Sequence, residues 1–361
     1  MLKVFKGWID RYFSDEGALI FLLLLISCFA VIIGFGSVLA PVFIAIIMAY
    51  LLQGGMSYCK RKGLGNLIST LIMFAFFVGV FLAILFVVIP ATLSQAGQLF
   101  YELPKMLAQG QGLLMLLPER YPDLITEIQV KNWTGQAGRE LASIGQWVLS
   151  FSFHSIPGAI TILIYLVLVP ILVFFFLKDS SKITQFLLSF LPSDRWLMNT
   201  IWAEMEIQIA NYIRGKVVEI IIVGGVTYIG FVSFDLQYAE LLAILVGLSV
   251  LIPYIGAAVV TVPVAMIAYF QFGYGETLFY CLLVYGIIQA LDGNVLVPLL
   301  FSEAVNLHPV AIIVAVLAFG GIWGFWGVFF AIPLATLFKA ILTAWPQVIK
   351  RVEPLQSNDE R

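Results

Sequence analysis

Long uncharged apolar runs alternate with short polar segments along this chain. The first run, 17–59, contains no charged residue. About 20 helical residues cross the roughly 30 Å hydrocarbon core of a bilayer, so this run predicts two membrane-spanning helices with a break near 34–37. Further single spans are predicted at 66–90, 156–177 and 217–234. The pattern therefore predicts an all-α, polytopic integral membrane protein, and residues 1–90 are expected to hold spans one to three.

Two polar segments interrupt the apolar runs. The segment 91–155 is compatible with helices, and three prolines are expected to break it: Pro104, Pro118 and Pro122. The segment 178–216 contains a predicted amphipathic helix that starts near Ser193. Its apolar positions recur every four residues and are Leu197, Ile201, Met205 and Ile209. Such a helix lies at the membrane surface, docks on the helical bundle or packs in the ordinary way against a neighbouring span.

The composition agrees with a membrane location. Of the 361 residues, 61% are hydrophobic and 11% are charged, whereas about a quarter of the residues in soluble domains are charged. The three cysteines, Cys28, Cys59 and Cys281, are odd in number and lie in or beside apolar runs. A disulfide framework or a metal site is therefore not expected. Acidic residues offset the basic ones in 91–155, so the expected partner is the lipid bilayer and not a nucleic acid.

The distribution of basic residues predicts the orientation in the membrane. If the N-terminus is cytoplasmic, the inside segments 1–16, 59–65, 178–216 and 339–361 contain 15 of the 19 lysines and arginines. The other four fall in 91–155, which would be extracytoplasmic. This distribution agrees with the positive-inside tendency of membrane proteins. Both termini, including the tail 346–361, are expected in the cytoplasm, so the number of spans should be even and about eight.

The region 217–345 is expected to form a translocation domain with broken helices. From 217 to 338 it has no lysine or arginine but six acids: Glu219, Asp235, Glu240, Glu276, Asp292 and Glu303. Its apolar pieces are short, since 241–253 holds only 13 residues and 256–272 contains Pro263. Pieces of this length predict re-entrant or discontinuous helices. Such backbone is tolerated at membrane depth only beside protein or a water-filled cavity, and it commonly builds the binding site of a transporter.

Several motifs in this part of the chain resemble those of a known family. They are YIRGK at 212–216, IPYIGA at 252–257 and the stretch 295–342, which begins VLVPLLFSEAVNLHP. The chain looks like a member of the autoinducer-2 exporter (AI-2E) family, and the stretch 11–53 resembles its PerM-type permease branch. The resemblance covers nearly the whole chain. It implies a bacterial inner-membrane protein of about eight spans, with export of autoinducer-2 in some members and sodium or lithium/proton antiport in others.

Asp292 is the first candidate for the transport pathway. If a helix starts near Glu276, Asp292 lies about 24 Å further along it, toward the far face of the membrane. One interpretation is a solvated loop residue beside Gly293 and Asn294 that caps the next helix. The other is a carboxylate at a helix break that binds a cation or carries a proton, because acids inside a membrane usually face a bundle interior or an aqueous pathway.

Glu303 and His308 form a second candidate pair. The Leu-His-Pro element predicts a helix start, with Pro309 in the first turn, where the missing N–H costs nothing. His308 then either hydrogen-bonds this turn or takes part in proton coupling or substrate contact, because imidazole titrates near neutral pH. One histidine does not define a metal site.

The sequence Pro253-Tyr254-Ile255-Gly256 predicts a turn that ends a helix. Proline removes a backbone donor, and glycine permits a positive φ or close packing. The functional alternative is a hairpin tip that lines the pathway, with freed carbonyls and the Tyr254 hydroxyl as ligands. This segment is therefore expected to be either a structural turn or part of the pathway.

Gly320, Gly324 and Gly327 are expected to lie on one helix, where Gly320-x-x-x-Gly324 is a close-packing motif. The functional alternative for this motif is association between subunits, and a homo-oligomer is expected. Arg214 is expected to be a cytoplasmic anchor or to pair with Glu219 at the membrane edge.

The sequence contains no catalytic constellation. It has no glycine-rich loop ending in Gly-Lys-Ser/Thr, and neither histidine lies in a nucleophile or metal pattern. We therefore expect no enzyme and no cofactor. The leading hypothesis is a secondary transporter or facilitator that exports a small organic solute of the autoinducer-2 kind, driven by the solute's own gradient or by the proton gradient. A sodium or lithium/proton antiporter is the alternative, and a non-transporting membrane scaffold is the third.

Overall fold

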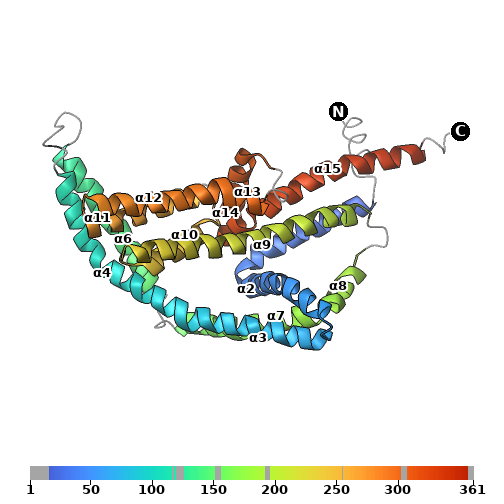
Figure 1. The fold of residues 1–361 in the computed structure, drawn as a ribbon. Helices are drawn as coiled ribbons and strands as arrows, with labels where there is room; N and C mark the ends of the chain where they lie inside the picture. The colour runs from blue at the N-terminus through green and yellow to red at the C-terminus, as the bar shows by residue number, and fades with distance from the viewer. Residues whose placement is uncertain are drawn as a thin grey trace, which may run out of the picture.

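The computed structural model describes residues 16–115, 118, 126–150, 156–191, 196–253, 255–301 and 307–356 of the protein. This part of the chain contains no strand, so the predicted all-α fold is confirmed (Figure 1). The helices are α2 Glu16–Arg61, α3 Asn66–Ala83, η1 Ile84–Val88, α4 Ile89–Leu114, α6 Glu127–Ser150, α7 Ile156–Lys178, α8 Ser180–Ser189, α9 Trp196–Ser233, α10 Ala239–Ser249, α11 Ile255–Phe272, α12 Glu276–Leu291, η2 Asp292–Leu296, α13 Val297–Phe301, α14 Pro309–Phe329 and α15 Ala331–Gln356.

Seven helical stretches of the described chain are long and apolar enough to cross a membrane, or eight if the pair α7 and α8, bent by 82°, forms one span. The chain is thus a polytopic membrane protein of about the expected number of spans. α2 contributes two of the stretches, Leu19–Gly36 and Val38–Arg61. Ser37 separates them, inside the segment where the first apolar run was expected to break, and the ribbon of α2 bends along its length (Figure 1).

The third predicted span is part of a much longer rod. α3, η1 and α4 follow one another without a break, and Asn66–Gly112 is one helical stretch of 47 residues that contains an apolar window; its length is about 70 Å. The expected boundary between a span and a polar segment at 90/91 therefore falls inside a continuous helix. Pro104, which was expected to break the chain, also lies inside α4, while Pro122 lies outside the described residues.

α9 joins two elements that the sequence pattern separates. The amphipathic segment and the fifth span form one helix of 38 residues, Trp196–Ser233. The apolar side chains of its first half are buried and pack against Ala340 of α15. Docking on the bundle, and not exposure at a membrane surface, therefore explains the four-residue periodicity. The continuous helix carries side chains from this contact into the middle of the C-terminal half.

Two hydrophobic cores hold the C-terminal half together, and α9 contributes to both. The first joins α9 to α10, α11 and α12, with Leu242, Val264 and Tyr285 among its buried members. The second joins α9 to α2, α13, α14 and α15 and contains Tyr212 and Phe301. A third core, made by α2, α3 and α7, lies apart from them. Between the first two cores, the Lys216 and Glu219 side chains of α9 are buried in protein.

Several helix ends with basic residues lie at the same end of the molecule. The start of α2, the turn from α2 to α3, α8, the start of α9 and the end of α15 all lie at the right-hand end in Figure 1. Their basic residues are Lys60, Arg61, Lys62, Lys182, Lys350 and Arg351. The opposite end holds the tips of α4 and α6 and the connection from α11 to α12 (Figure 1).

Candidate substrate cavity

A cavity of about 390 Å³ lies among the helices of the C-terminal half. α9, the turn between α10 and α11, α12 with η2, α13, α14 and α15 all contribute to its wall. Most of the lining is apolar, and the polar side chains are those of Lys216, Glu219, Gln289 and Asp292. Sites for small molecules have volumes of roughly 300–1,000 Å³ and linings of this kind. The cavity therefore has the size and the surface for one small organic solute.

Two interruptions of regular helix border this cavity. α10 ends at Ser249, and α11 begins at Ile255 after a turn that places Pro253 in the wall. On the other side, α12 changes into the π-helical turn η2, which begins at Asp292. Turns of π-helix often occur at functional sites. The turn between α10 and α11 is a break between helices, whereas η2 continues α12 into α13 without a break, and both lie where the polar side chains converge.

Gly256 allows the two helices to approach this closely. A Cβ atom at this position would lie 1.8 Å from the carbonyl oxygen of Ser249. No side chain fits at that distance, so only glycine permits α11 to start directly against the end of α10.

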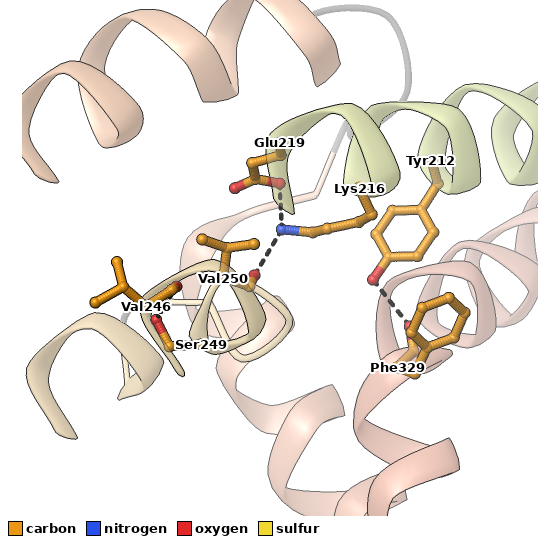
Figure 2. A network of polar contacts seen from close by, with 7 residues as sticks. All are labelled: Tyr212, Lys216, Glu219, Val246, Ser249, Val250 and Phe329. Atoms are coloured by element: carbon orange, nitrogen blue, oxygen red, sulfur yellow. Dashed lines mark hydrogen bonds and ion pairs between the residues drawn. The ribbon is translucent and has the colours of Figure 1, made fainter. Parts of the chain in front are cut away.

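Lys216 and Glu219 form an ion pair inside the protein (Figure 2). The Lys216 ammonium donates to Glu219 Oε2 at 2.7 Å and to the carbonyl oxygen of Val250 at 2.8 Å. It also lies 5.1 Å from the centre of the Phe301 ring. The two side chains are only 5% and 2% exposed. Removing both charges from water is costly, and the short charge-assisted hydrogen bonds offset that cost.

α9 is joined by side chains to the ends of two interrupted helices. Val250, the acceptor for Lys216, is the C-terminal cap of α10. One turn earlier on α9, the Tyr212 hydroxyl donates to the carbonyl oxygen of Phe329 at 2.8 Å, and Phe329 is the last residue of α14 (Figure 2). Carbonyl groups at a helix end have no partner within the helix. Two buried donors on one helix therefore satisfy acceptors that the interruptions create.

Asp292 and Gln289 carry buried polar atoms that have no hydrogen-bond partner. These atoms are Asp292 Oδ1 and Gln289 Nε2, an acceptor and a donor three residues apart on α12 and η2. Residues at this spacing share a helix face. Asp292 also interacts electrostatically with Lys216 and Glu219. Because a buried polar atom without a partner is costly, this pair is suited to a ligand that both accepts and donates hydrogen bonds.

Three residues expected on the pathway lie elsewhere in the structure. His308 is exposed and caps α14, where its Nδ1 accepts from the N–H of Val310 at 3.3 Å. The helix start predicted from Leu-His-Pro is thereby confirmed, and His308 does not line the cavity. Asn294 is also exposed and donates within its own helix to the Ala290 carbonyl. Arg214 contacts the Tyr50 ring and hydroxyl, and the partner of Glu219 is Lys216 instead.

The other expected residues have mixed outcomes. Glu219, Asp292 and Pro253 line the cavity, whereas Gly256 supports the turn beside it. Asp292 begins a helical turn and is not the loop residue of the simpler interpretation. Tyr254 and Glu303 lie outside the described residues.

The glycines of α14 do not form one packed helix surface. Gly324 has φ 59° and ψ −136°, so the helix is broken there, and no atom lies within 4 Å of a Cβ built on it. The expected contact of Gly320 and Gly324 with a neighbouring helix is therefore replaced by a kink. Gly320 faces Val328, and Gly327 lies against the carbonyl of Phe319. These contacts fold the end of α14 back on itself.

Lys216 and Gln289 are functional candidates that the sequence interpretation missed. Lys216 directly precedes the stretch without basic residues and was grouped with cytoplasmic anchors. Its spacing of three residues from Glu219 was the available signal, because residues at this spacing are neighbours on a helix. Gln289 stands three residues before Asp292, which is the same signal.

Sequence similarity identifies the family of this chain. The sequence profile of the AI-2E family transporters matches residues 19–347. The chain belongs to this family. The resemblance noted in the motifs is thus confirmed, and the AI-2E match contains every residue that lines the cavity.

Relatives within the AI-2E family are named as transport proteins. "Putative permease PerM" of Escherichia coli (strain K12) is 48% identical over 346 residues, which are 96% of this chain and 98% of the relative. "Putative transport protein YueF" of Bacillus subtilis is 28% identical and covers 86% of this chain and 85% of its own length. Family membership and these relatives identify the chain as a membrane transport protein.

Proposed function

We propose that this protein exports a small organic solute of the autoinducer-2 kind through the cavity beside Lys216, and that protons move through Asp292 during the cycle. The family and the relatives support transport as the general function. The position of Asp292 is the main support for the proposed solute and for proton movement. Asp292 lines a cavity of about 390 Å³ and holds a buried carboxylate oxygen without a partner.

The cavity favours a polar uncharged solute over a bare metal cation. Its described charges are one ammonium, on Lys216, and two carboxylates, on Glu219 and Asp292. The ammonium already donates hydrogen bonds to the Glu219 carboxylate and to the Val250 carbonyl. A sodium or lithium ion would have to enter beside this fixed positive charge, whereas a hydroxylated solute can bind the free atoms of Asp292 and Gln289.

A proton can enter this site in place of the solute. Protonation makes Asp292 a neutral donor, so its hydrogen bonding to a bound hydroxyl group changes from acceptor to donor. The interruptions at η2 and at the turn between α10 and α11 provide the backbone adjustments that a cavity open first to one side and then to the other requires. A cycle in which solute and proton alternate at Asp292 couples the two movements.

We also propose that the protein lies in the bacterial inner membrane with both termini in the cytoplasm and that it forms a homo-oligomer. The turn from α2 to α3, α8 and the end of α15, which carry Lys60, Arg61, Lys62, Lys182, Lys350 and Arg351, lie at one end of the molecule (Figure 1), which supports this orientation. Labelling of cysteines introduced at Lys62 and Lys131, in a cysteine-free background, tests it. Only the cysteine at position 131 should react with an impermeant maleimide added outside intact spheroplasts.

Transport by Asp292→Asn in proteoliposomes tests the function. Liposomes are loaded with autoinducer-2, a pH gradient is imposed, and solute efflux and internal pH are followed together. The wild type should move both, and Asp292→Asn should lose gradient-driven efflux and proton movement while it remains inserted. Glu276→Gln is the matched control, because Glu276 is an exposed acid at the start of the same helix and should be dispensable. The proposal fails if Asp292→Asn keeps proton-driven efflux or if the wild type shows none.

A further inference from the structure

The ammonium group of Lys216 is bound in the way that a transported cation would be. Its two oxygen ligands are Glu219 Oε2 at 2.7 Å and the Val250 carbonyl at 2.8 Å (Figure 2). One is a carboxylate three residues further along α9, and the other belongs to the C-terminal cap of α10. The ring of Phe301 lies on another side at 5.1 Å.

These are the ligands that coupling ions use in transporters with discontinuous helices. Unwound backbone carbonyls and the C-terminal ends of half-helices coordinate sodium there, because the helix dipole places negative partial charge at that end. The end of α10 supplies such a carbonyl through Val250, and Glu219 supplies a carboxylate. A further carboxylate oxygen, Asp292 Oδ1, is buried nearby without a partner. The oxygens of a small-cation site are therefore present, and a lysine side chain occupies it.

We infer that Lys216 is a tethered cation that takes the place of a coupling sodium ion, and that removal of its ammonium group exposes a binding site for a small monovalent cation. The contacts of Lys216 alone support the cation site. The further expectation, that solute transport by the wild type requires no sodium, rests on the proposed function.

The charge of the site explains why the two cations exclude each other. With Lys216 present, the ammonium balances Glu219, and only Asp292 contributes an uncompensated carboxylate. A neutral side chain at position 216 leaves two carboxylates around a space that an ammonium group had filled. In a medium of low polarity, two like charges attract a counter-ion much more strongly than they do in water. A sodium or lithium ion then replaces the lost ammonium.

Thermal unfolding of the purified full-length protein in detergent tests the cation site. Lys216→Gln is compared in sodium chloride and in N-methyl-D-glucamine chloride at equal ionic strength. Its Tm should be lowered in the organic salt and should rise by about 5 °C as sodium saturates the site. The wild type should be insensitive to the exchange of salts. Lys182→Gln is the matched control, since Lys182 also forms an ion pair three residues away from its acid, with Asp179, but is 83% exposed.

A double variant and the wild type provide further tests of the inference. Lys216→Gln/Glu219→Gln lacks a ligand of the exposed site and should lose the response to sodium. The wild type alone also decides the question: a sodium-dependent rise in its Tm would overturn the tethered-cation role, and so would an unchanged Tm of Lys216→Gln in both salts.

Efflux of autoinducer-2 from wild-type proteoliposomes gives the coupling result. It should be the same whether both sides contain sodium or N-methyl-D-glucamine, and loss of efflux without sodium would contradict the inference. If the wild type moves no solute under any gradient, the proposed function fails, while the unfolding experiment still decides whether Lys216 occupies a cation site.

Discussion

Replacement of the ion pair between Lys216 and Glu219 should produce strongly non-additive effects on stability. Lys216→Met keeps the length of the side chain but removes two charge-assisted hydrogen bonds, to Glu219 and to the Val250 carbonyl. Bonds to charged groups contribute about 1.5–3 kcal/mol each, so their loss is worth about 3–6 kcal/mol. Breaking a buried pair by removing one partner costs about 3–5 kcal/mol. The two estimates agree, and we expect a loss of about 3–5 kcal/mol.

The double variant Lys216→Met/Glu219→Leu should be more stable than either single variant. Glu219→Leu alone leaves a buried ammonium with only the Val250 carbonyl, so it should also lose about 3–5 kcal/mol. In the double variant neither charge of the pair remains. The Val250 carbonyl then lacks a donor, which costs about 1–3 kcal/mol. The expected loss for the double variant is therefore about 1–3 kcal/mol, well below the sum of the single losses.

Unfolding of the purified protein in mixed detergent micelles, followed by tryptophan fluorescence, measures these differences. The exposed pair Lys182 and Asp179 is the control, and its removal should change stability by less than about 1 kcal/mol. If the double variant loses as much as the two single variants together, Lys216 and Glu219 are not coupled and the electrostatic reasoning is wrong. If Lys216→Met is as stable as the wild type, removal of one partner of this buried pair has no energetic cost, and the expected loss is wrong.

Two glycine substitutions test the interruptions of the helices by the same unfolding measurement. Gly256→Ala places a Cβ atom 1.8 Å from the Ser249 carbonyl oxygen, so it should lose more than about 2 kcal/mol, whereas Gly286→Ala on α12, with nothing within 4 Å, should be tolerated. Equal stability of the two variants would contradict the close contact. Gly324→Ala should lose about 1–3 kcal/mol through its backbone conformation alone, because φ is 59° and no neighbour is in reach. Gly321→Ala, which is also free of neighbours, should be neutral or stabilising; a destabilised Gly321→Ala would show that packing, and not φ, is decisive.

The sequence predicted the existence of helices better than their ends. The turn at Pro253 and the helix start at His308 carry proline, whose missing N–H and fixed φ act locally, so both were visible in the sequence. Pro104 shows the limit of this signal, because α4 continues through it. α9 was divided wrongly because periodicity reports what surrounds a helix and not where the helix stops. Its surroundings change between Met205 and Glu219, but its hydrogen bonds continue.

The candidate site was only half visible in the sequence. Asp292 and Glu219 stood out as acids in an apolar region, and both line the cavity. Their cation did not stand out, because Lys216 lies next to a segment with ordinary basic residues. The remaining ligands are the backbone carbonyls of Val250 and Phe329, and each lies far along the chain from its donor. No side-chain pattern marks a carbonyl group, so these contacts follow from the three-dimensional structure alone.

The rod formed by α3, η1 and α4 is about twice as long as the hydrocarbon core of a bilayer is thick. Near its middle, Gln95 accepts from the N–H of Leu241 at 3.0 Å and donates to Glu240 at 3.3 Å, both in the first turn of α10. The portion of α4 beyond Gln95 is joined to α6. A displacement of α6 is therefore passed through the shorter portion of α4 to Gln95 and the start of α10, and the other end of α10 holds the Val250 carbonyl that Lys216 binds.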